Sequence, residues 1–314
     1  MGTTNQYVAY GLKIQTSTRL PVLLPGSGGT GTSLSLSIEQ GDKKKMRPLS
    51  YEAPLITLHG KTIRLSSDLP LSFPISSKKR CWKLEVGNEF LFDWRNISNK
   101  VRAWYFTSEP DLFKLAFWLL HTIIPVYLIL KGTSLFLHAA AIEFDKKAIL
   151  FLAPSQGGKS TLADIFVQRG HRLLSDDKIR LHLTGSRCLA FPSYPYLRRS
   201  RKNENLGDFT ESFSNEPLYV STFYELNFVN PQNKCEIIPL SGLHKFEVFK
   251  RSYLYQPVSI SIKEGELLMH LAKHYKLYQI KLPKNVKKLS AVYNTIVSHI
   301  EQRGITRDSD FSTL

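Results

Sequence analysis

The sequence predicts an α/β protein with two parts: a smaller β-rich domain over residues 1–108, and a domain over 109–314 that combines a mixed sheet with flanking helices. Short strand-like stretches fill the first hundred residues, longer apolar segments begin after Pro110, and a strand, a glycine-containing loop and a helix follow one another near the middle. At about 150 residues per domain, 314 residues fit one large or two modest domains.

The first part contains five β-rich stretches bounded by turn residues. They are Tyr7–Thr16, Leu34–Glu39, Leu55–Leu65, Trp82–Val86 and Phe90–Trp94. Between them, residues 25–33 and 41–48 have the composition of loops. The first loop contains the run GSGGTG, but no Lys-Ser or Lys-Thr pair closes it, so we interpret it as a turn and not as a phosphate loop.

The segment Leu112–Leu130 is apolar enough to resemble a membrane span. Lys114, His121 and Pro125 interrupt it, however, and a transmembrane helix would place the lysine and the histidine in lipid. We therefore expect a buried helix beneath a sheet and no membrane span.

Strands and helices alternate in the second part. Leu135–Phe144 and Ala148–Leu152 are expected to form two strands joined by a tight turn, followed by a helix that ends at Gly170. Arg172–Asp177 and Lys178–Leu183 are expected to form another strand pair. Further strands are expected at Tyr219–Phe228, Glu236–Pro239 and Tyr278–Leu282, and a packing helix at Leu289–Ile300.

The strongest motif is APSQGGKS at residues 153–160, which fits the phosphate-binding pattern GxxxxGK[ST] except that Ala153 replaces its first glycine. Such a loop turns its backbone N–H groups toward phosphates at a helix N-terminus. Lys159 would reach the β- and γ-phosphates, and Ser160 would bind Mg²⁺. The residues expected to contact the nucleotide are Ser155, Gln156, Gly157, Gly158, Lys159, Ser160 and Thr161.

Two carboxylates and a histidine complete the candidate site. Asp176 and Asp177 end an apolar strand shortly after the loop's helix, where a carboxylate can hold Mg²⁺ or orient a nucleophile. Two adjacent aspartates at a strand end can also form a solvated turn. His138 lies in an otherwise apolar strand, where a lone histidine can equally be a core residue.

The composition limits the possible partners. The chain has 42 Lys+Arg against 26 Asp+Glu, a net charge of +16, which indicates an anionic partner. No helix-turn-helix or zinc pattern supports nucleic-acid binding. Cys81, Cys188 and Cys235 are widely spaced and form no CxxC pair, which is typical of a reducing compartment. The N-terminus has no signal-peptide pattern, so the expected location is the cytoplasm.

The run from HAAAIEF through the loop to RGHRLLSDD (residues 138–177) resembles the HPr kinase/phosphorylase family, P-loop kinases that phosphorylate serine. The resemblance is dense over Leu135–Leu183 and weak elsewhere. It implies an HPr-kinase-like core in which His138 is the active-site histidine, Lys159 and Ser160 bind nucleotide and metal, and Asp176 and Asp177 are the carboxylates. The family's Leu-Glu-Ile-Arg-Gly run is absent.

The amino-terminal hundred residues do not look like the sensor kinase's N-terminal domain. They look instead like those of HPr-kinase-related proteins such as the lasso peptide kinases, which phosphorylate a serine at the carboxyl end of a precursor peptide. The resemblance thus implies a serine kinase that uses ATP and Mg²⁺ on a peptide or small protein. An HPr-type protein kinase and a non-catalytic, nucleotide-dependent binding module remain alternatives, and an oligomer is possible.

For phosphate transfer from ATP to a substrate serine, we expect Asp176 to be the catalytic base, assisted by His138, and Asp177 to bind the metal together with Ser160. Arg198 and Arg199 are candidates for stabilising phosphate charge, since a guanidinium suits that role. The remaining basic clusters around Lys44, Lys79 and Arg199 are interpreted as a surface for an acidic or phosphorylated peptide.

Overall fold

A computed structural model describes residues 4–23, 26, 33–71, 76–132, 134–185, 187–198, 204–230, 234–254, 262–283 and 289–304. The chain divides into two compact units. Unit 1 comprises Met1–Ser134, Arg201–Leu206 and Tyr255–Ile260, and unit 2 comprises Leu135–Ser200, Gly207–Leu254 and Ser261–Leu314. The helical segment after residue 108 therefore belongs to unit 1, whereas the sequence had suggested a boundary ahead of it.

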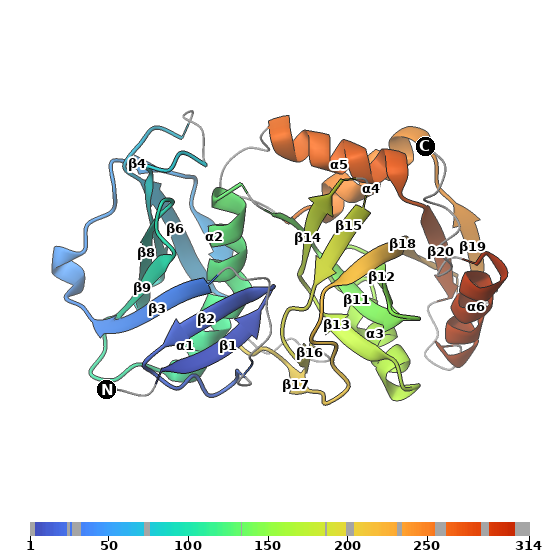
Figure 1. Ribbon diagram of the computed structural model, residues 1–314, viewed down its shortest axis with the longest axis horizontal. Helices are drawn as coiled ribbons and strands as arrows, with labels where there is room; N and C mark the ends of the chain where they lie inside the picture. Colours follow the sequence, from blue (N-terminus) through green and yellow to red (C-terminus); the bar gives the residue numbers. More distant parts are fainter. Residues whose placement is uncertain are drawn as a thin grey trace. The chain divides into compact units, whose positions relative to one another are not determined.

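Unit 1 is built on one nine-stranded sheet, ordered β1-β2-β3-β9-β8-β7-β6-β4 with β5 paired to β6 (Figure 1). The strands are β1 Asn5–Ala9, β2 Leu12–Thr16, β3 Ser33–Gln40, β4 Tyr51–Glu52, β5 Ile56–Leu58, β6 Lys61–Ser67, β7 Cys81–Val86, β8 Phe90–Arg95 and β9 Lys100–Tyr105. A short 3₁₀ turn, η1, spans Lys43–Lys45.

The expected β-rich stretches are confirmed, but two of them are hairpins. Within 7–16, Tyr10 and Gly11 turn the chain with φ of 55° and 74°. Within 55–65, His59 and Gly60 do the same with φ of 50° and 75°. A turn of this kind matches the twist of the flanking strands because both central residues are left-handed. Apart from Gly26, the GSGGTG run lies outside the described residues.

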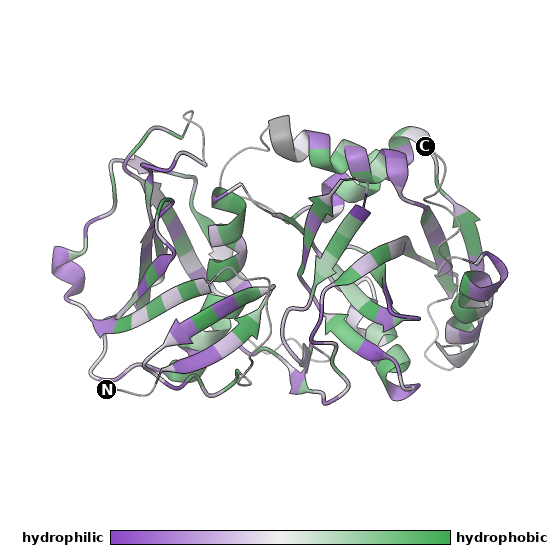
Figure 2. Cartoon of the chain, in the orientation of Figure 1, coloured by the Kyte–Doolittle hydropathy of each residue, from purple (hydrophilic) through white to green (hydrophobic). Residues whose placement is uncertain are grey.

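The apolar segment 112–130 forms α1 Leu112–Trp118, a π-helical turn η2 Leu119–Ile123, and α2 Ile124–Leu130. The segment is long and apolar enough to cross a membrane, with a mean hydropathy of 1.8, but 78% of it is buried. Figure 2 shows its mostly hydrophobic character. Tyr127 packs edge-on against Trp94 of β8 and its hydroxyl donates to the carbonyl of Ser98 at 3.3 Å. The prediction of a buried core helix is confirmed.

Unit 2 is a mixed sheet with helices on both faces, which confirms the α/β class. The strands are β10 Leu135–Leu137, β11 Ala139–Phe144, β12 Lys147–Leu152, β13 Arg172–Ser175, β14 Ile179–Thr184, β15 Arg187–Phe191, β18 Leu218–Val229, β19 Glu236–Pro239 and β20 Leu277–Pro283. Their order is β10-β14-β15-β18-β12-β11-β13, with β20 joining β18 and β19. Strands β12, β18 and β20 run parallel, and β16 Tyr196–Leu197 pairs with β17 Asp208–Phe209 outside this sheet.

The unit 2 sheet has a hydrophobic core on each of its two faces. One face packs against α4 Gly242–Ser252 and α5 Ile262–His274 through residues such as Phe249 and Leu271. The other packs against α3 Lys159–Gln168 and α6 Leu289–Gln302 through residues such as Phe166 and Ile296. Side chains of successive strand residues point to opposite faces, so each strand serves both cores.

The expected hairpin before the loop is present. Asp145 and Lys146 carry positive φ of 47° and 61° and close β11 onto β12, which pair antiparallel from Phe144–Lys147 to Ala139–Leu152. The expected single strand 135–144 is instead broken at His138. There the chain leaves its pairing with β14 and begins pairing with β12 and β13.

Candidate active site

The loop between β12 and α3 has the backbone of a tight anion-binding turn. Gln156 and Gly158 both lie in the left-handed region, with φ of 64° and 85°. Gly158 is the N-cap of α3, and no side chain caps that end. The first N–H groups of a helix have no partner within it, so they are available to a ligand, and the helix dipole favours an anion there.

The glycines of the loop are needed for space as well as for backbone angles. A Cβ on Gly157 would lie 2.5 Å from Cβ of Ala153 and 2.9 Å from the carbonyl oxygen of Pro154. A Cβ on Gly158 would lie 3.0 Å from the ring of Phe228 on β18. Ala153 itself is buried, so its departure from the motif is accommodated by the missing side chain of Gly157.

The Lys159 ammonium is buried and held in the loop. It donates to the carbonyls of Ala153 at 2.8 Å and Pro154 at 3.0 Å, and it lies 2.9 Å from Nε2 of His138. Each of these three partners accepts a hydrogen bond from the ammonium, and a phosphate oxygen could take its place. The structure thus places the lysine of the motif at the helix start, as the sequence predicted.

Asp176 is almost completely buried, at 1% exposure, and both of its oxygens are used. Oδ1 accepts from the Ser160 hydroxyl at 2.9 Å, and Oδ2 accepts from the backbone N–H of Arg198 at 2.8 Å. Burial raises the pKa of Asp176 to about 6, and the neighbouring Asp177 adds to the rise. The hydrogen bonds from Arg198 and Ser160 oppose this shift because they stabilise the charged form.

Asp177 occupies the turn after β13 in a left-handed conformation, with φ of 80°, which aspartate tolerates better than most residues. Two cations and a histidine contact its carboxylate. Oδ2 lies 3.3 Å from Nζ of Lys178 and 3.6 Å from an Arg198 guanidinium nitrogen, and Oδ1 lies 3.3 Å from Nδ1 of His138. It is also more exposed than Asp176, at 9% against 1%.

His138 links the loop lysine to the second aspartate. Its Nδ1 lies 2.9 Å from the backbone carbonyl of Asp177, which can only accept, so Nδ1 carries the proton. Nε2 is then the acceptor for Lys159. Burial lowers the pKa of His138 and Lys159 lowers it further, against the opposing effect of Asp177. The ring is therefore neutral at pH 7, with one defined tautomer.

The side chains present fit Mg²⁺ together with a nucleotide phosphate. Mg²⁺ is usually held by one or two carboxylates plus hydroxyl, water and phosphate oxygens, and Ser160 and Asp176 supply a hydroxyl and a carboxylate in contact. Among the described residues, no cluster of three or more His, Cys, Asp or Glu side chains suits a metal held by protein alone.

Most of the predicted site residues lie together in unit 2: His138, Lys159, Ser160, Asp176, Asp177 and Arg198 are connected through the contacts above. Ser155, Gln156 and Thr161 are exposed along the loop and the first turn of α3. Arg199 lies outside the described residues. Lys178 was missed, although its position directly after two aspartates is a signal for a paired cation.

The geometry favours a division of roles between the aspartates that is the reverse of the sequence expectation. Asp176 is almost completely buried and contacts the metal-ligand candidate Ser160, which suits metal binding and not proton removal from a substrate. Asp177 is more exposed and adjoins His138. Sequence alone does not separate two neighbouring aspartates, because burial and backbone twist decide which one faces inward.

No protein-family model matches the sequence, and the search of curated proteins gives no match. Among solved structures, the chain is similar to the HPr(Ser) kinase/phosphatase from Coxiella burnetii. The TM-score is 0.35 and the identity 17%, over 55% of this chain and 94% of that chain. We therefore infer function from the side chains of the site and not from this likeness.

Proposed function

We propose that this protein is an ATP-dependent serine kinase that acts on a peptide. The observation that carries the proposal is the connected set Lys159, His138, Asp177, Asp176 and Ser160 at the end of a strand, loop and helix. In phosphoryl transfer the protein need not form a covalent bond to the transferred group. Positioning and charge stabilisation are its main needs, and this set supplies both.

The loop and Lys159 bind the phosphates of ATP, because the lysine exchanges the carbonyls of Ala153 and Pro154 for phosphate oxygens. Ser160 and Asp176, which are in contact, would hold Mg²⁺. The metal would supply charge neutralisation at the β- and γ-phosphates. Arg198, whose guanidinium lies 3.6 Å from Asp177, is available to stabilise charge on the transferred group.

Asp177 accepts the proton of the substrate serine hydroxyl. Its carboxylate is held by Lys178, Arg198 and His138, so its orientation is fixed before the substrate binds. His138 fixes the positions of Asp177 and Lys159 relative to each other. Its Nδ1–H donates to the Asp177 carbonyl and its Nε2 accepts from Lys159. The histidine thereby couples the position of the base to that of the phosphate-binding lysine.

The proposed acceptor is the carboxyl-terminal serine of a ribosomally made precursor peptide, in the cytoplasm. Support comes from the resemblance of residues 135–183 to the HPr kinase/phosphorylase family and from the resemblance of the β-rich first part to the lasso peptide kinases. The net charge of +16 also suits an acidic partner.

The test is incubation of the purified full chain with γ-³²P-ATP and Mg²⁺, and in separate reactions with the precursor peptide encoded beside its gene or with HPr. Label on the peptide, lost when its terminal serine is replaced by alanine, is the expected result. Label on HPr alone would reassign the substrate. ATP-dependent peptide binding with no label on either acceptor would contradict kinase activity and indicate a binding module.

The matched control is Asp177→Asn, which removes the base and leaves the loop intact. It should bind ATP with unchanged affinity and transfer label about 10²–10⁴-fold more slowly than wild type. If this variant transfers label at the wild-type rate, the role of Asp177 is wrong even if the protein is a kinase.

A further inference from the structure

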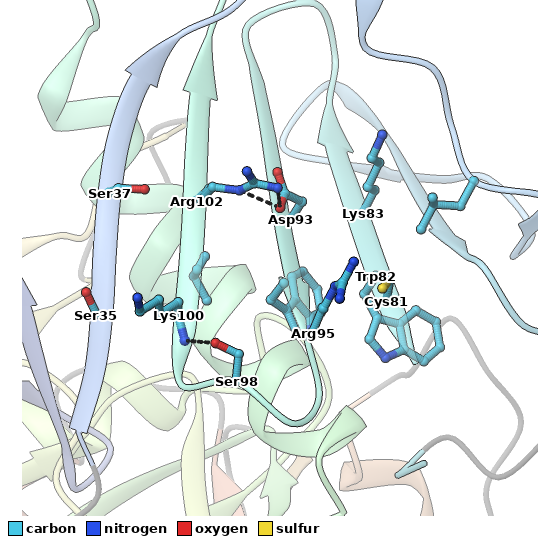
Figure 3. A pocket seen from close by; sticks show the side chains of 13 residues that line it. Ser35, Ser37, Cys81, Trp82, Lys83, Asp93, Arg95, Ser98, Lys100 and Arg102 are labelled. Carbon is cyan, nitrogen blue, oxygen red and sulfur yellow. Dashed lines mark hydrogen bonds and ion pairs between the residues drawn. The ribbon is translucent and has the colours of Figure 1, made fainter. Parts of the chain in front are cut away.

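One face of the unit 1 sheet carries a basic groove. Four adjacent strands, β3, β9, β8 and β7, line it, and Figure 3 shows their side chains on this face. The cavity has a volume of about 670 Å³, within the usual range for ligand sites. Its polar lining residues are Ser35, Ser37, Cys81, Lys83, Asp93, Arg95, Ser98, Lys100 and Arg102.

Strand register brings the cations together. Ser35 pairs with Lys100 and Ser37 with Arg102 across β3 and β9. On the next strands, Asp93 pairs with both Arg102 and Lys83. Residues two apart on one strand point to the same face about 7 Å apart, and neighbouring strands lie about 4.8 Å apart, so these charges form a row across the sheet.

Positive charge in the groove exceeds what its single carboxylate can neutralise. Asp93 accepts from the Arg102 guanidinium at 2.7 and 2.9 Å and from the Trp104 indole at 2.5 Å, so its oxygens are already occupied. Arg95 and Lys100 are exposed, and among the described residues neither has an ion-pair partner within 4.0 Å. Two lining cations are thus available to an anionic ligand.

The lining favours a peptide over a nucleic acid. Single-stranded nucleic acid binds through aromatic rings on which bases stack. The tryptophans that line this groove, Trp82 and Trp94, are buried, at 0% and 3% exposure, and belong to the opposite core face. The half-buried Trp104 lies beside the groove, but the Arg102 guanidinium lies over its ring, 5.4 Å from the centroid. Serine hydroxyls and a row of separated cations instead match an extended chain with several carboxylates.

We propose that this groove binds an acidic segment of the peptide substrate through Arg95 and Lys100, while the charges of Lys83 and Arg102 add to the positive potential of the groove. The proposal deepens the proposed function and rests on it for the identity of the ligand as a substrate. It names the substrate class: a peptide with a run of Asp or Glu apart from its phosphorylated serine. The basic clusters around Lys44 and Lys79 that the sequence singled out do not line this groove, and Arg199 lies outside the described residues.

The binding test uses the full chain and fluorescein-labelled hexaglutamate as the probe, followed by fluorescence anisotropy. The groove variant is Arg95→Glu with Lys100→Glu. The control is Lys250→Glu with Lys273→Glu, two exposed lysines of unit 2 with the same change in charge. The groove variant should weaken binding at least about tenfold and the control less than about twofold, because exposed charge pairs act over short range.

Three results would overturn the inference: equal weakening in both variants, no weakening in the groove variant, or tighter binding of a decauridine RNA than of hexaglutamate. Thermal unfolding of each variant shows whether a loss of binding reflects a loss of folding.

A second measurement separates this inference from the proposed function. Phosphate transfer to a serine peptide with an acidic segment is compared with transfer to the same peptide in which Gln replaces each acid. The groove predicts a higher KM for the neutral peptide, and the groove variant should abolish that difference with kcat unchanged. If neither peptide is phosphorylated while hexaglutamate still binds, the proposed kinase activity is wrong and the binding of acidic peptides in the groove still stands.

Discussion

The Ser160 hydroxyl donates to Oδ1 of Asp176 across 2.9 Å, which joins the first turn of α3 to the end of β13. The contact places a hydroxyl and a carboxylate side by side at the phosphate-binding loop. Because the backbone N–H of Arg198 occupies the other oxygen, Asp176 is fixed in this position. Because Asp176 is buried, its ionisation should lower the free energy of unfolding.

We expect Asp176→Asn to stabilise the protein at pH 8 in the absence of nucleotide and metal. Burial raises the pKa of Asp176 to about 6, above the value of about 3.9 in an unfolded chain. Between these values the folded state binds more protons, so the carboxyl's contribution to stability falls as pH rises from about 4 to about 6. Asparagine does not ionise and avoids this loss, a gain of about 1–3 kcal/mol.

Urea unfolding of wild type and variant at pH 5 and pH 8 measures this effect. The variant's advantage should be clear at pH 8 and shrink toward pH 5. Asp164→Asn, at a half-buried position on α3, controls for the loss of one carboxylate. A variant that is less stable than wild type at both pH values would show that the Asp176 charge is not costly.

The two aspartates should respond differently to metal. Asp176→Asn should raise the Mg²⁺ concentration needed for transfer, and excess Mg²⁺ should restore part of the activity because Ser160 and the phosphates still supply ligands. Asp177→Asn should lower transfer about 10²–10⁴-fold at every Mg²⁺ concentration, since loss of a general base is not repaired by metal. Transfer assays over a Mg²⁺ series distinguish the two, and the opposite pattern would return the roles to those expected from sequence.

His138 should be neutral with its proton on Nδ1 at pH 7, and should take up its second proton at a lower pH than an ordinary histidine. Burial lowers its pKa, so the unfolded chain takes up a proton before the folded protein does. Stability from this group is therefore full above about pH 6.5 and declines as pH falls toward the folded pKa.

¹⁵N NMR of the imidazole nitrogens measures tautomer and titration directly, with exposed His182 as an internal comparison. In His138→Gln the corresponding decline in stability should disappear. A proton found on Nε2 at pH 7 would contradict the assigned hydrogen bond to Lys159.

Features of this site were predictable from the sequence where they depend on residues within a few positions of one another. The loop, the hairpin before it and the pair Asp176–Asp177 follow from turn residues and spacing within a few positions, and all were predicted from sequence. The break at His138 was not, because LFLHAAAIEF is continuously apolar and only pairing with two different strands interrupts it. Arg198 reaches Asp177 through a tertiary contact that no short pattern encodes, whereas Lys178 directly follows the two aspartates and its local signal was missed.

The same distinction applies to the helix 112–130. Its burial was predicted from the lysine, histidine and proline that a membrane span would not contain, but its π-helical centre at Leu119–Ile123 was not. Its assignment to unit 1 was also not predicted, since it depends on contacts such as Tyr127 with Trp94 and Ser98, far away in sequence.

Gly157→Ala should impair nucleotide binding because the new Cβ has no room. It would lie 2.5 Å from Cβ of Ala153 and 2.9 Å from the Pro154 carbonyl, one of the acceptors of Lys159. We expect at least a tenfold loss of ATP affinity, or about 1.4 kcal/mol, measured by calorimetry. Gly265→Ala is the control, since nothing lies within 4 Å of its Cβ and a helix gains from alanine. Adding Ala153→Gly removes the closer contact and should restore affinity only in part, because the Pro154 carbonyl remains. Full affinity in Gly157→Ala alone would mean that the loop opens when it binds phosphate.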